Sequence, residues 1–421
     1  MPNFRVQYLR GTVWGLTPEQ IRTRIIEGVN SHTGQPMMQE VLAKLTSALT
    51  AEERDMSEKK MDVGPPTYTD TEENLHRLFL DRRYTDFLPV VLPTTAKVNE
   101  MLAQTSRNPD DVLGNMNPGS VAGETWTYTV RHAAIAAVMA GSKPEYFPVI
   151  LAIGSTGTSA INISDNGFAS GAVINGRIRD EIGLNYDVGA IGPFAHANTT
   201  IGRAWSLLSI NGGNAGKVGT TYMGTVGNPL NLINVIIAEN EEQSPWEPLS
   251  VRRGFNRGDN VVTLLNGWGL LSARNWQVTD WTATPDYPGT VQSIYRLQNP
   301  GLFGTMVVLN PSVAGFIAER FKTLEEFEAF VTTPDPNAKP KFAAKPGGDA
   351  KPKVEGAAKP GGDAKPKVEG AAKPKVAPKP KVAGNATSQN FAVVVTGSSN
   401  NNYWMIGGLG PGQSVQIDPW R

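Results

Sequence analysis

An internal repeat near the carboxyl end most strongly limits what this chain can fold into. The 14 residues AAKPGGDAKPKVEG occupy 343–356 and recur unchanged at 357–370, and a degenerate copy, AAKPKVAPKPKVAG, fills 371–384. A sequence of this composition cannot bury an apolar face, so we expect an extended, disordered tether. The apolar run NFAVVV then begins at 390. The tract is therefore expected to be an insertion within a domain.

The 421 residues are enough for one large domain with insertions. We expect four segments. They are an N-terminal helical extension and linker over 1–67, a main body over 68–333, the Lys/Pro/Gly/Ala insertion over 334–385, and C-terminal strands over 386–421 that complete the body.

Apolar periodicity predicts both helices and strands in these segments. In the extension, Thr17 is the expected N-cap of a helix over 16–29, and a second helix is expected over 37–54. Between 124 and 157 the pattern runs strand, alanine-rich helix, apolar run, which is typical of α/β layers. Further helices are expected at 69–83, 96–105 and 313–331, and strands at 87–95, 231–239, 260–269, 304–312 and within 390–408. The predicted fold class is a mixed α/β layered body, part of which is open to an α+β arrangement.

Composition excludes several kinds of chemistry. The chain has no cysteine, which excludes disulfides, thiolate metal sites, iron–sulfur clusters and a cysteine nucleophile. Its 39 basic and 39 acidic residues balance, but 334–384 holds 12 lysines against 5 acidic residues, so the rest is mildly acidic. That balance gives no reason to expect nucleic acid as a partner. No stretch approaches 18 apolar residues, so we expect no membrane span and a cytoplasmic location.

The segment GPFAHANTTIGR, 192–203, is the first candidate site. His196 stands in a polar turn that leads into a predicted helix, where free backbone N–H groups could bind an anion. Asn198, Thr199 and Arg203 follow on that helix and are candidates for binding substrate. The alternative is a capped helix with a surface histidine.

The segment IAENEEQSPWEP, 237–248, is the second candidate. Glu239, Glu241 and Glu242 follow a predicted buried strand, and ligands of α/β proteins bind at the carboxyl ends of strands. Clustered carboxylates could hold a divalent cation or serve as acid and base, with Trp246 beside the substrate. A solvated turn is the alternative.

Charges alternate in the third candidate, VINGRIRDEIGLNYD, over 173–187. Arg177 there could clamp a carboxylate or phosphate, although the same run could form ion pairs at a subunit contact. Combining the three, we expect His196 and Glu239 to face one cavity. The catalytic candidates are His196, Glu239 and Glu241, the substrate-binding candidates are Asn198, Thr199, Arg203, Arg177 and Trp246, and any metal would be held by His196, Glu239 and Glu242. No cofactor is identified.

Several stretches resemble a known family. They include FLPVVLPTTAKVNEMLA, AAVMAGSKPEYFPVILA, VINGRIRDEIGLN, GPFAHANTTIGRAW, GNPLNLINVIIAENEEQSPWEPLSVRRGF and SVQIDPWR. Together they are similar to the large companion proteins of UGSC-type proteins, small thiol- or selenol-containing proteins named for a selenocysteine-Gly-Ser-Cys motif. The resemblance covers most of 68–331 and 386–421. It implies a redox or thiol-dependent complex, and Ser142 stands where it implies a cysteine.

Three hypotheses for function follow. The leading one is a large subunit of a hetero-oligomeric, oxidoreductase-like complex, which builds the substrate pocket while a thiol- or selenol-bearing partner supplies the reactive group. The second is a self-sufficient metal-dependent lyase or hydratase with histidine and glutamate ligands. The third is a structural or interaction protein. The glycine-rich loops and the extra N-terminal helices also predict a homo-oligomer that acts on a small molecule.

Overall fold

The computed structural model describes residues 17–30, 33–48, 65–117, 125–162, 167–218, 221–222, 224, 226–273, 286–298, 304–334, 382–383, 391–399 and 403–421. The chain forms two compact units, residues 1–59 and residues 60–421. Most of the expected linker and nearly all of the expected insertion lie outside the described residues.

The N-terminal unit contains α1 (Pro18–Ile21), a π-helical turn (Arg22–Ile26) and α2 (Met37–Thr46). The predicted cap at Thr17 is confirmed. Its hydroxyl accepts from the Gln20 N–H while the Gln20 side chain accepts from the Thr17 N–H, so both orphan donors are satisfied. Helix α2 is shorter than expected and ends before Ser47, whose backbone is extended.

Residues 60–421 form the body. Its helices are α4 (Glu72–Asp81), α5 (Thr95–Leu102), α6 (Val130–Ala140), α7 (Phe147–Gly154), α8 (Ile178–Glu181), α9 (His196–Gly213), α10 (Leu249–Arg252), α11 (Tyr287–Gln298), α12 (Pro311–Arg320) and α13 (Leu324–Thr332). Its strands are β1 (Val112–Met116), β2 (Trp126–Thr129), β3 (Ala169–Asn175), β4 (Val235–Ala238), β5 (Val261–Gly267), β6 (Leu271–Ala273), β7 (Thr305–Leu309), β8 (Val382–Ala383), β9 (Phe391–Val395), β10 (Trp404–Gly407) and β11 (Leu409–Gln416).

Two mixed sheets make the centre of the body. The five-stranded sheet has the order β4-β3-β5-β11-β8, with β3 and β4 parallel and the other pairs antiparallel. The four-stranded sheet has the order β6-β10-β7-β9, with β7 and β9 parallel. Strands β1 and β2 form a separate antiparallel pair.

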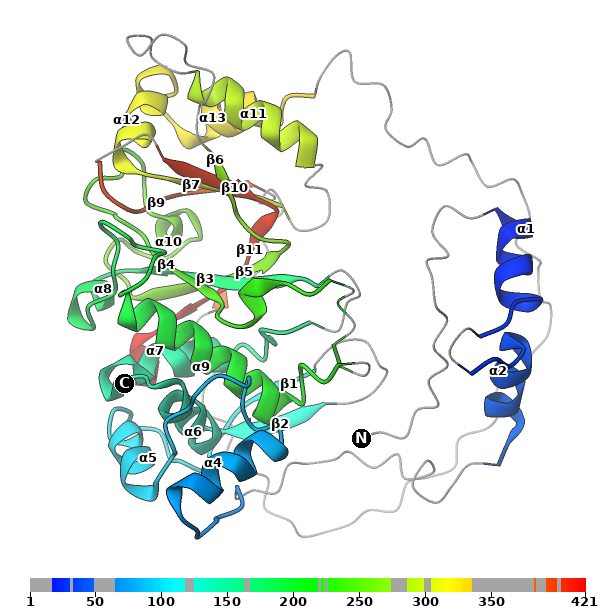
Figure 1. The fold of residues 1–421 in the computed structure, drawn as a ribbon. Helices are drawn as coiled ribbons and strands as arrows, with labels where there is room; N and C mark the ends of the chain where they lie inside the picture. The colour runs from blue at the N-terminus through cyan, green and yellow to red at the C-terminus, as the bar shows by residue number, and fades with distance from the viewer. Residues whose placement is uncertain are drawn as a thin grey trace, which may run out of the picture. The chain divides into compact units, whose positions relative to one another are not determined.

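The elements of the body stack as four layers, helices, sheet, sheet, helices (Figure 1). Side chains alternate between the two faces of a strand, so each sheet contributes to two cores. On β4, Ile236 and Ala238 pack with α6, α7 and α9, whereas Val235 and Ile237 pack against Met306 of β7 in the second sheet. The outer face of the second sheet packs against α11, α12 and α13. The fold class expected from the sequence, a mixed α/β body, is confirmed.

The chain passes from one sheet to the other at a corner built from glycines. β5 and β11 pair in the five-stranded sheet, and their neighbours in sequence, β6 and β10, pair in the four-stranded sheet. At this corner a Cβ on Gly267 would lie 1.9 Å from the Gly408 carbonyl oxygen, and one on Gly407 would lie 1.8 Å from that of Gly269. Only glycine allows the two backbones to approach so closely.

Three expectations need correction. The apolar run of 145–157 is mostly helix α7 and not a strand, because a fully buried helix shows no polar face by which to recognise it. The run of 87–95 forms no strand, since Pro89 and Pro93 supply no backbone donors. Within the expected tether, Val382–Ala383 forms β8 on the edge of the five-stranded sheet.

Among the described residues, no helix is long and apolar enough to cross a membrane.

Candidate functional site

A cavity of about 470 Å³ lies at one end of the four-stranded sheet. The parallel strands β7 and β9 both end there, and antiparallel β10 begins there. The carboxyl ends of neighbouring parallel strands are the usual place for a ligand in such sheets. The cavity is lined by Val188, Gly189, Ala190, Ile191, Gly192, Val308, Leu309, Asn310, Thr396, Gly397, Ser398, Tyr403, Trp404 and Met405.

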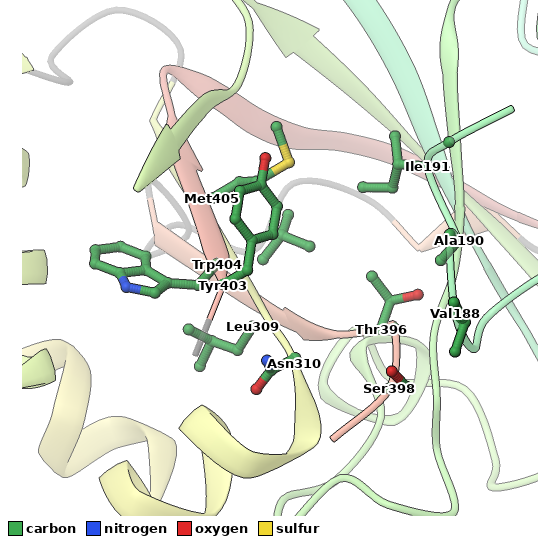
Figure 2. A pocket seen from close by; sticks show the side chains of 14 residues that line it. Val188, Ala190, Ile191, Leu309, Asn310, Thr396, Ser398, Tyr403, Trp404 and Met405 are labelled. Carbon is green, nitrogen blue, oxygen red and sulfur yellow. The ribbon is translucent and has the colours of Figure 1, made fainter. Parts of the chain in front are cut away.

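The loop 188–192, which precedes α9, forms the wall opposite the sheet. Figure 2 shows Val188, Ala190 and Ile191 on one side of the space, with Leu309, Tyr403 and Met405 across from them. The two walls are joined by a bond from the Gly397 N–H to the Tyr186 carbonyl oxygen, 2.9 Å long. Gly397 has φ of 86°, a conformation that favours glycine, and a Cβ there would meet no atom within 4 Å.

The lining is mainly apolar with a few hydroxyl and amide groups. Asn310 caps α12 by accepting from the Val313 N–H at 2.8 Å, and Tyr403 bonds through its hydroxyl to Ser272 at 2.6 Å. Ser398 is half-buried and its hydroxyl lies at the cavity (Figure 2). None of the lining residues carries a charge at neutral pH. This lining fits an uncharged, largely apolar molecule that is oriented by a few hydrogen bonds.

The acidic segment after β4 lies next to this cavity. Asn240 donates its N–H to the Val395 carbonyl oxygen at 2.7 Å, and the Thr396 hydroxyl donates to the Ala238 carbonyl oxygen at 2.7 Å. The end of β4 therefore bonds to the end of β9, across the boundary between the two sheets. The expectation that 239–242 follows a buried strand is confirmed.

Glu239 is sealed in the body and only 1% exposed. One of its carboxylate oxygens accepts from the Asn175 side chain at 2.7 Å and from the Leu249 N–H at 2.8 Å. The other oxygen lies 3.9 Å from the Arg252 guanidinium. Burial raises the pKa of Glu239, and the nearby Arg252 charge and these two hydrogen bonds act in the opposite direction.

Glu241 and Glu242 bind the turn that follows β3. Glu241 accepts from the Gly176 N–H at 2.7 Å and from the Asn175 side chain at 3.0 Å. Glu242 forms a two-pronged pair with Arg179, at 2.8 and 3.2 Å. The hydrogen bond from Arg179 lowers the pKa of Glu242.

Arg179 holds this cluster together. Its side chain is only 3% exposed, lies over the Tyr186 ring at 4.8 Å, and donates to the carbonyl oxygens of Gly176 and Glu239. The charge of Arg179 is paired with Glu242, and most of its N–H groups donate hydrogen bonds. The cluster therefore acts as a rigid support.

The shared cavity expected for His196 and Glu239 is not formed. His196 is exposed at the start of α9, where its Nδ1 lies 3.3 Å from the Tyr146 hydroxyl. Helix α9 covers one face of the five-stranded sheet, whereas the Glu239 side chain turns to the opposite face, toward Leu249 and Arg252. His196 and Glu239 therefore lie on neighbouring elements, α9 and the end of β4, but the five-stranded sheet separates their side chains.

The expected metal ligands are not brought together either. Within the described ranges, no group of three histidine, aspartate or glutamate side chains is placed to hold a metal ion. The oxygens of Glu239 and Glu242 face hydrogen-bond donors, and His196 lies elsewhere.

The residues expected to bind substrate have mainly structural contacts. Asn198 bonds to the backbone of Asn185 and to the Ile236 carbonyl, so it fastens α9 to β4. Arg203 forms a two-pronged pair with Asp86, both distances being 2.9 Å. The remaining three candidates are Trp246, which stacks on Phe327 in the outer core, Thr199, which is half-buried, and Arg177, which is exposed.

Sequence reasoning missed most of the cavity. A signal was present, because the apolar runs TMVVL and FAVVV are followed by NPS and TGSS, polar turns that suit the ends of parallel strands.

Comparison of the chain with known protein families, with curated proteins and with solved structures finds no match.

Proposed function

We propose that this protein is the pocket-forming subunit of an enzyme complex. It binds a small, largely apolar molecule in the cavity at the ends of β7 and β9, and a partner subunit supplies the reactive group. The cavity carries the proposal, because it is roomy, mainly apolar and lined by hydroxyl and amide groups, which bind and orient better than they react.

The resemblance to companions of UGSC-type proteins supports the second half of the proposal. Such a complex would be cytoplasmic, and its thiol or selenol would come from the partner, because this chain has no cysteine. The acidic cluster then has a supporting role: Arg179 and Glu242 stiffen the turn beside Tyr186, whose carbonyl holds Gly397 at the cavity.

Binding is tested with Nile red, an uncharged dye whose emission rises in apolar surroundings. The full chain should bind it, and Ser398→Trp should weaken binding about tenfold or more, because the indole fills the cavity. Ser399→Trp is the matched control, since Ser399 is exposed and does not line the cavity. Equal binding by both variants would exclude this cavity as the site.

The partner is tested with iodoacetamide on the complex isolated from its native source. A cysteine-free chain has no thiol to alkylate, so labelling of a thiol or selenol must fall on another subunit. A labelled small subunit that co-elutes is the expected result. A complex that turns over substrate and contains no thiol or selenol would contradict the proposal that a partner subunit supplies the reactive group.

A further inference from the structure

The start of β10 places an aromatic ring and a thioether on one wall of the cavity. Successive side chains of an extended chain point to opposite faces, so residues two apart share a face. Trp404 is buried in the outer core, whereas Tyr403 and Met405, on either side of it in the sequence, line the cavity. Figure 2 shows the Trp404 ring directed away from the space that Tyr403 and Met405 border.

The Tyr403 ring is fixed at the cavity and still largely uncovered. Its hydroxyl bonds to the Ser272 hydroxyl on β6 at 2.6 Å, and β6 pairs with β10, so the side chain is held at both ends. The residue is nevertheless 45% exposed. Because its polar end already has a partner, Tyr403 presents mainly ring carbon to a ligand.

The opposite wall suits the second face of a flat ligand. Val188 and Ile191 there are exposed aliphatic side chains, and they face the cavity from the loop 188–192 (Figure 2). The bond from the Gly397 N–H to the Tyr186 carbonyl oxygen joins the two walls. A ring between them would have aliphatic carbon on one face and Tyr403 on the other, and both contacts would remove apolar surface from water.

Ser398 supplies a hydroxyl for the polar end of the ligand. Among the described residues, no group bonds to this hydroxyl, which is half-buried and lies at the cavity (Figure 2). By contrast, the Thr396 hydroxyl donates to the Ala238 carbonyl oxygen, and the Tyr403 hydroxyl bonds to Ser272. Of the hydroxyls on the described lining, that of Ser398 is therefore the one without a protein partner.

We propose that the ligand of this cavity is an uncharged aromatic molecule with one hydrogen-bonding oxygen. Its ring packs against Tyr403 and Met405, and its oxygen bonds to the Ser398 hydroxyl. This inference rests on the proposed function of the cavity and narrows its class of substrate.

The chemistry of the lining favours this class over its neighbours. None of the lining residues is charged, so a charged ligand would lose its hydration without gaining a counter-charge. Aromatic rings attract one another in offset and edge-on arrangements, and thioether sulfur also favours aromatic neighbours. A saturated ring of the same size would gain only its buried area.

Two ligands that differ only in aromaticity test the ring contact. Naphthol and decahydronaphthol share one carbon skeleton and carry the hydroxyl at the same carbon, and each is used to displace Nile red from the full chain. Naphthol should displace the dye at a concentration about fivefold lower, the scale of one or two aromatic contacts. Tyr403→Leu should remove most of this preference. Tyr403→Phe is the matched control, because it keeps the ring and loses the bond to Ser272.

The polar contact is tested by removing one oxygen at a time. Ser398→Ala should weaken the binding of naphthol about threefold or more and leave that of naphthalene, which has no hydroxyl, unchanged. Equal weakening of both ligands, or of neither, would overturn the assignment of Ser398.

The outcomes separate this inference from the proposed function. Equal displacement by naphthol and decahydronaphthol, or a preference that survives in Tyr403→Leu, would overturn the aromatic class while the cavity remained the binding site. A preference lost equally in Tyr403→Phe would assign it to the Ser272 bond and not to the ring. Nile red that fails to bind, or binds equally to Ser398→Trp and Ser399→Trp, would overturn the proposed function and this inference together.

Discussion

The hydroxyl of Thr396 donates to the carbonyl oxygen of Ala238 at 2.7 Å, and this bond joins β9 to β4 across two different sheets. Thr396 also donates its backbone N–H to Leu309, at the end of the neighbouring strand. One buried threonine thus fixes three strand ends around the cavity, which makes the shape of the cavity depend on the packing of the two sheets.

Removing that hydroxyl should loosen the site. Thr396→Val keeps the volume but leaves the Ala238 carbonyl without its partner, so it should lower the free energy of unfolding by about 1–3 kcal/mol. Thr396→Ser keeps the hydroxyl and should lower it by less. Urea unfolding measures both. A smaller loss in Thr396→Val than in Thr396→Ser would mean that the hydrogen bond contributes nothing.

The buried carboxyl of Glu239 should make stability depend on pH. Its pKa is raised in the folded protein, so folding takes up a proton in the window above the ordinary glutamate pKa. The stability that this group contributes is full below that ordinary value and declines as pH rises through the folded pKa. In Glu239→Gln the decline should be smaller, as urea midpoints at several pH values between 4.5 and 7 will show.

Glu241→Gln is the control for this measurement, because Glu241 lies in the same cluster and bonds to the same Asn175 side chain. It should keep most of the decline, because the Glu241 charge is the smallest of the influences on the pKa of Glu239. An unchanged pH slope in Glu239→Gln would mean that Glu239 does not take up the proton.

Arg179 should not tolerate lysine. An ammonium group cannot reproduce the paired bonds to Glu242 or the stacking on Tyr186, so Arg179→Lys should cost about 2 kcal/mol. Part of the Arg179–Glu242 pair is exposed to solvent on the glutamate side, which keeps the effect below that of a fully buried pair. Arg177→Lys, two positions away and exposed, should stay within about 0.5 kcal/mol. Equal effects of the two substitutions would argue against the supporting role of Arg179.

Self-association should depend on an exposed aromatic residue. Phe194 is fully exposed and has φ of 68°, so this chain holds a large apolar side chain outward in a strained conformation. Light scattering should give a mass well above the 45.3 kDa of one chain, and Phe194→Gly should lower it. Leu297→Ser, which changes another exposed apolar residue on α11, should not. A mass near 45 kDa for the unmodified chain would end the oligomer proposal.

Most of the repeat tract should be dispensable for folding. Replacing 339–378 with a short Gly/Ser loop keeps Val382–Ala383 on the sheet, so the melting temperature should change by less than about 2 °C. Extending the replacement to 384 removes β8 and should lower the melting temperature further. Differential scanning calorimetry compares the two. A drop above about 5 °C for the shorter replacement would show that the tract is packed.

Local signals predicted some starts of helices but not their ends. The cap at Thr17 follows from a side chain that accepts from a free N–H group of the first helical turn. The helix expected over 37–54, by contrast, ends at Thr46. Strands β4, β5 and β7 were found because each is an apolar run between turns. By contrast, β3 and β11 carry glycine or proline inside the strand, which weakens the local signal, and they become strands by pairing with β5 and their other neighbours.

The candidate site was predicted only in part. The position of Glu239 after a strand was clear, but the face it turns to depends on the alternation of β4 between two layers. One face of β4 packs against helices and the other against the second sheet. The second sheet forms by pairing among β7, β9 and β10, and the sequence near β4 contains no signal for that pairing. For the same reason the cavity, which those strands build with the loop 188–192, could not be predicted from the sequence.

The glycine corner has a consequence for synthesis on the ribosome. Strand β10 lies between β6 and β7, and β11 lies between β5 and β8, so both sheets are split until residues 404–416 emerge. Synthesis proceeds at roughly 5–20 residues per second, so the nascent body waits several seconds with unpaired strand edges while the tract is made. Nascent chains that stop within the tract would lack β9, β10 and β11, so β6 and β7 would have no strand between them and one edge of β5 would be unpaired. Such chains would be substrates for chaperones and proteases, whereas a chain that gains or loses one 14-residue repeat would close normally.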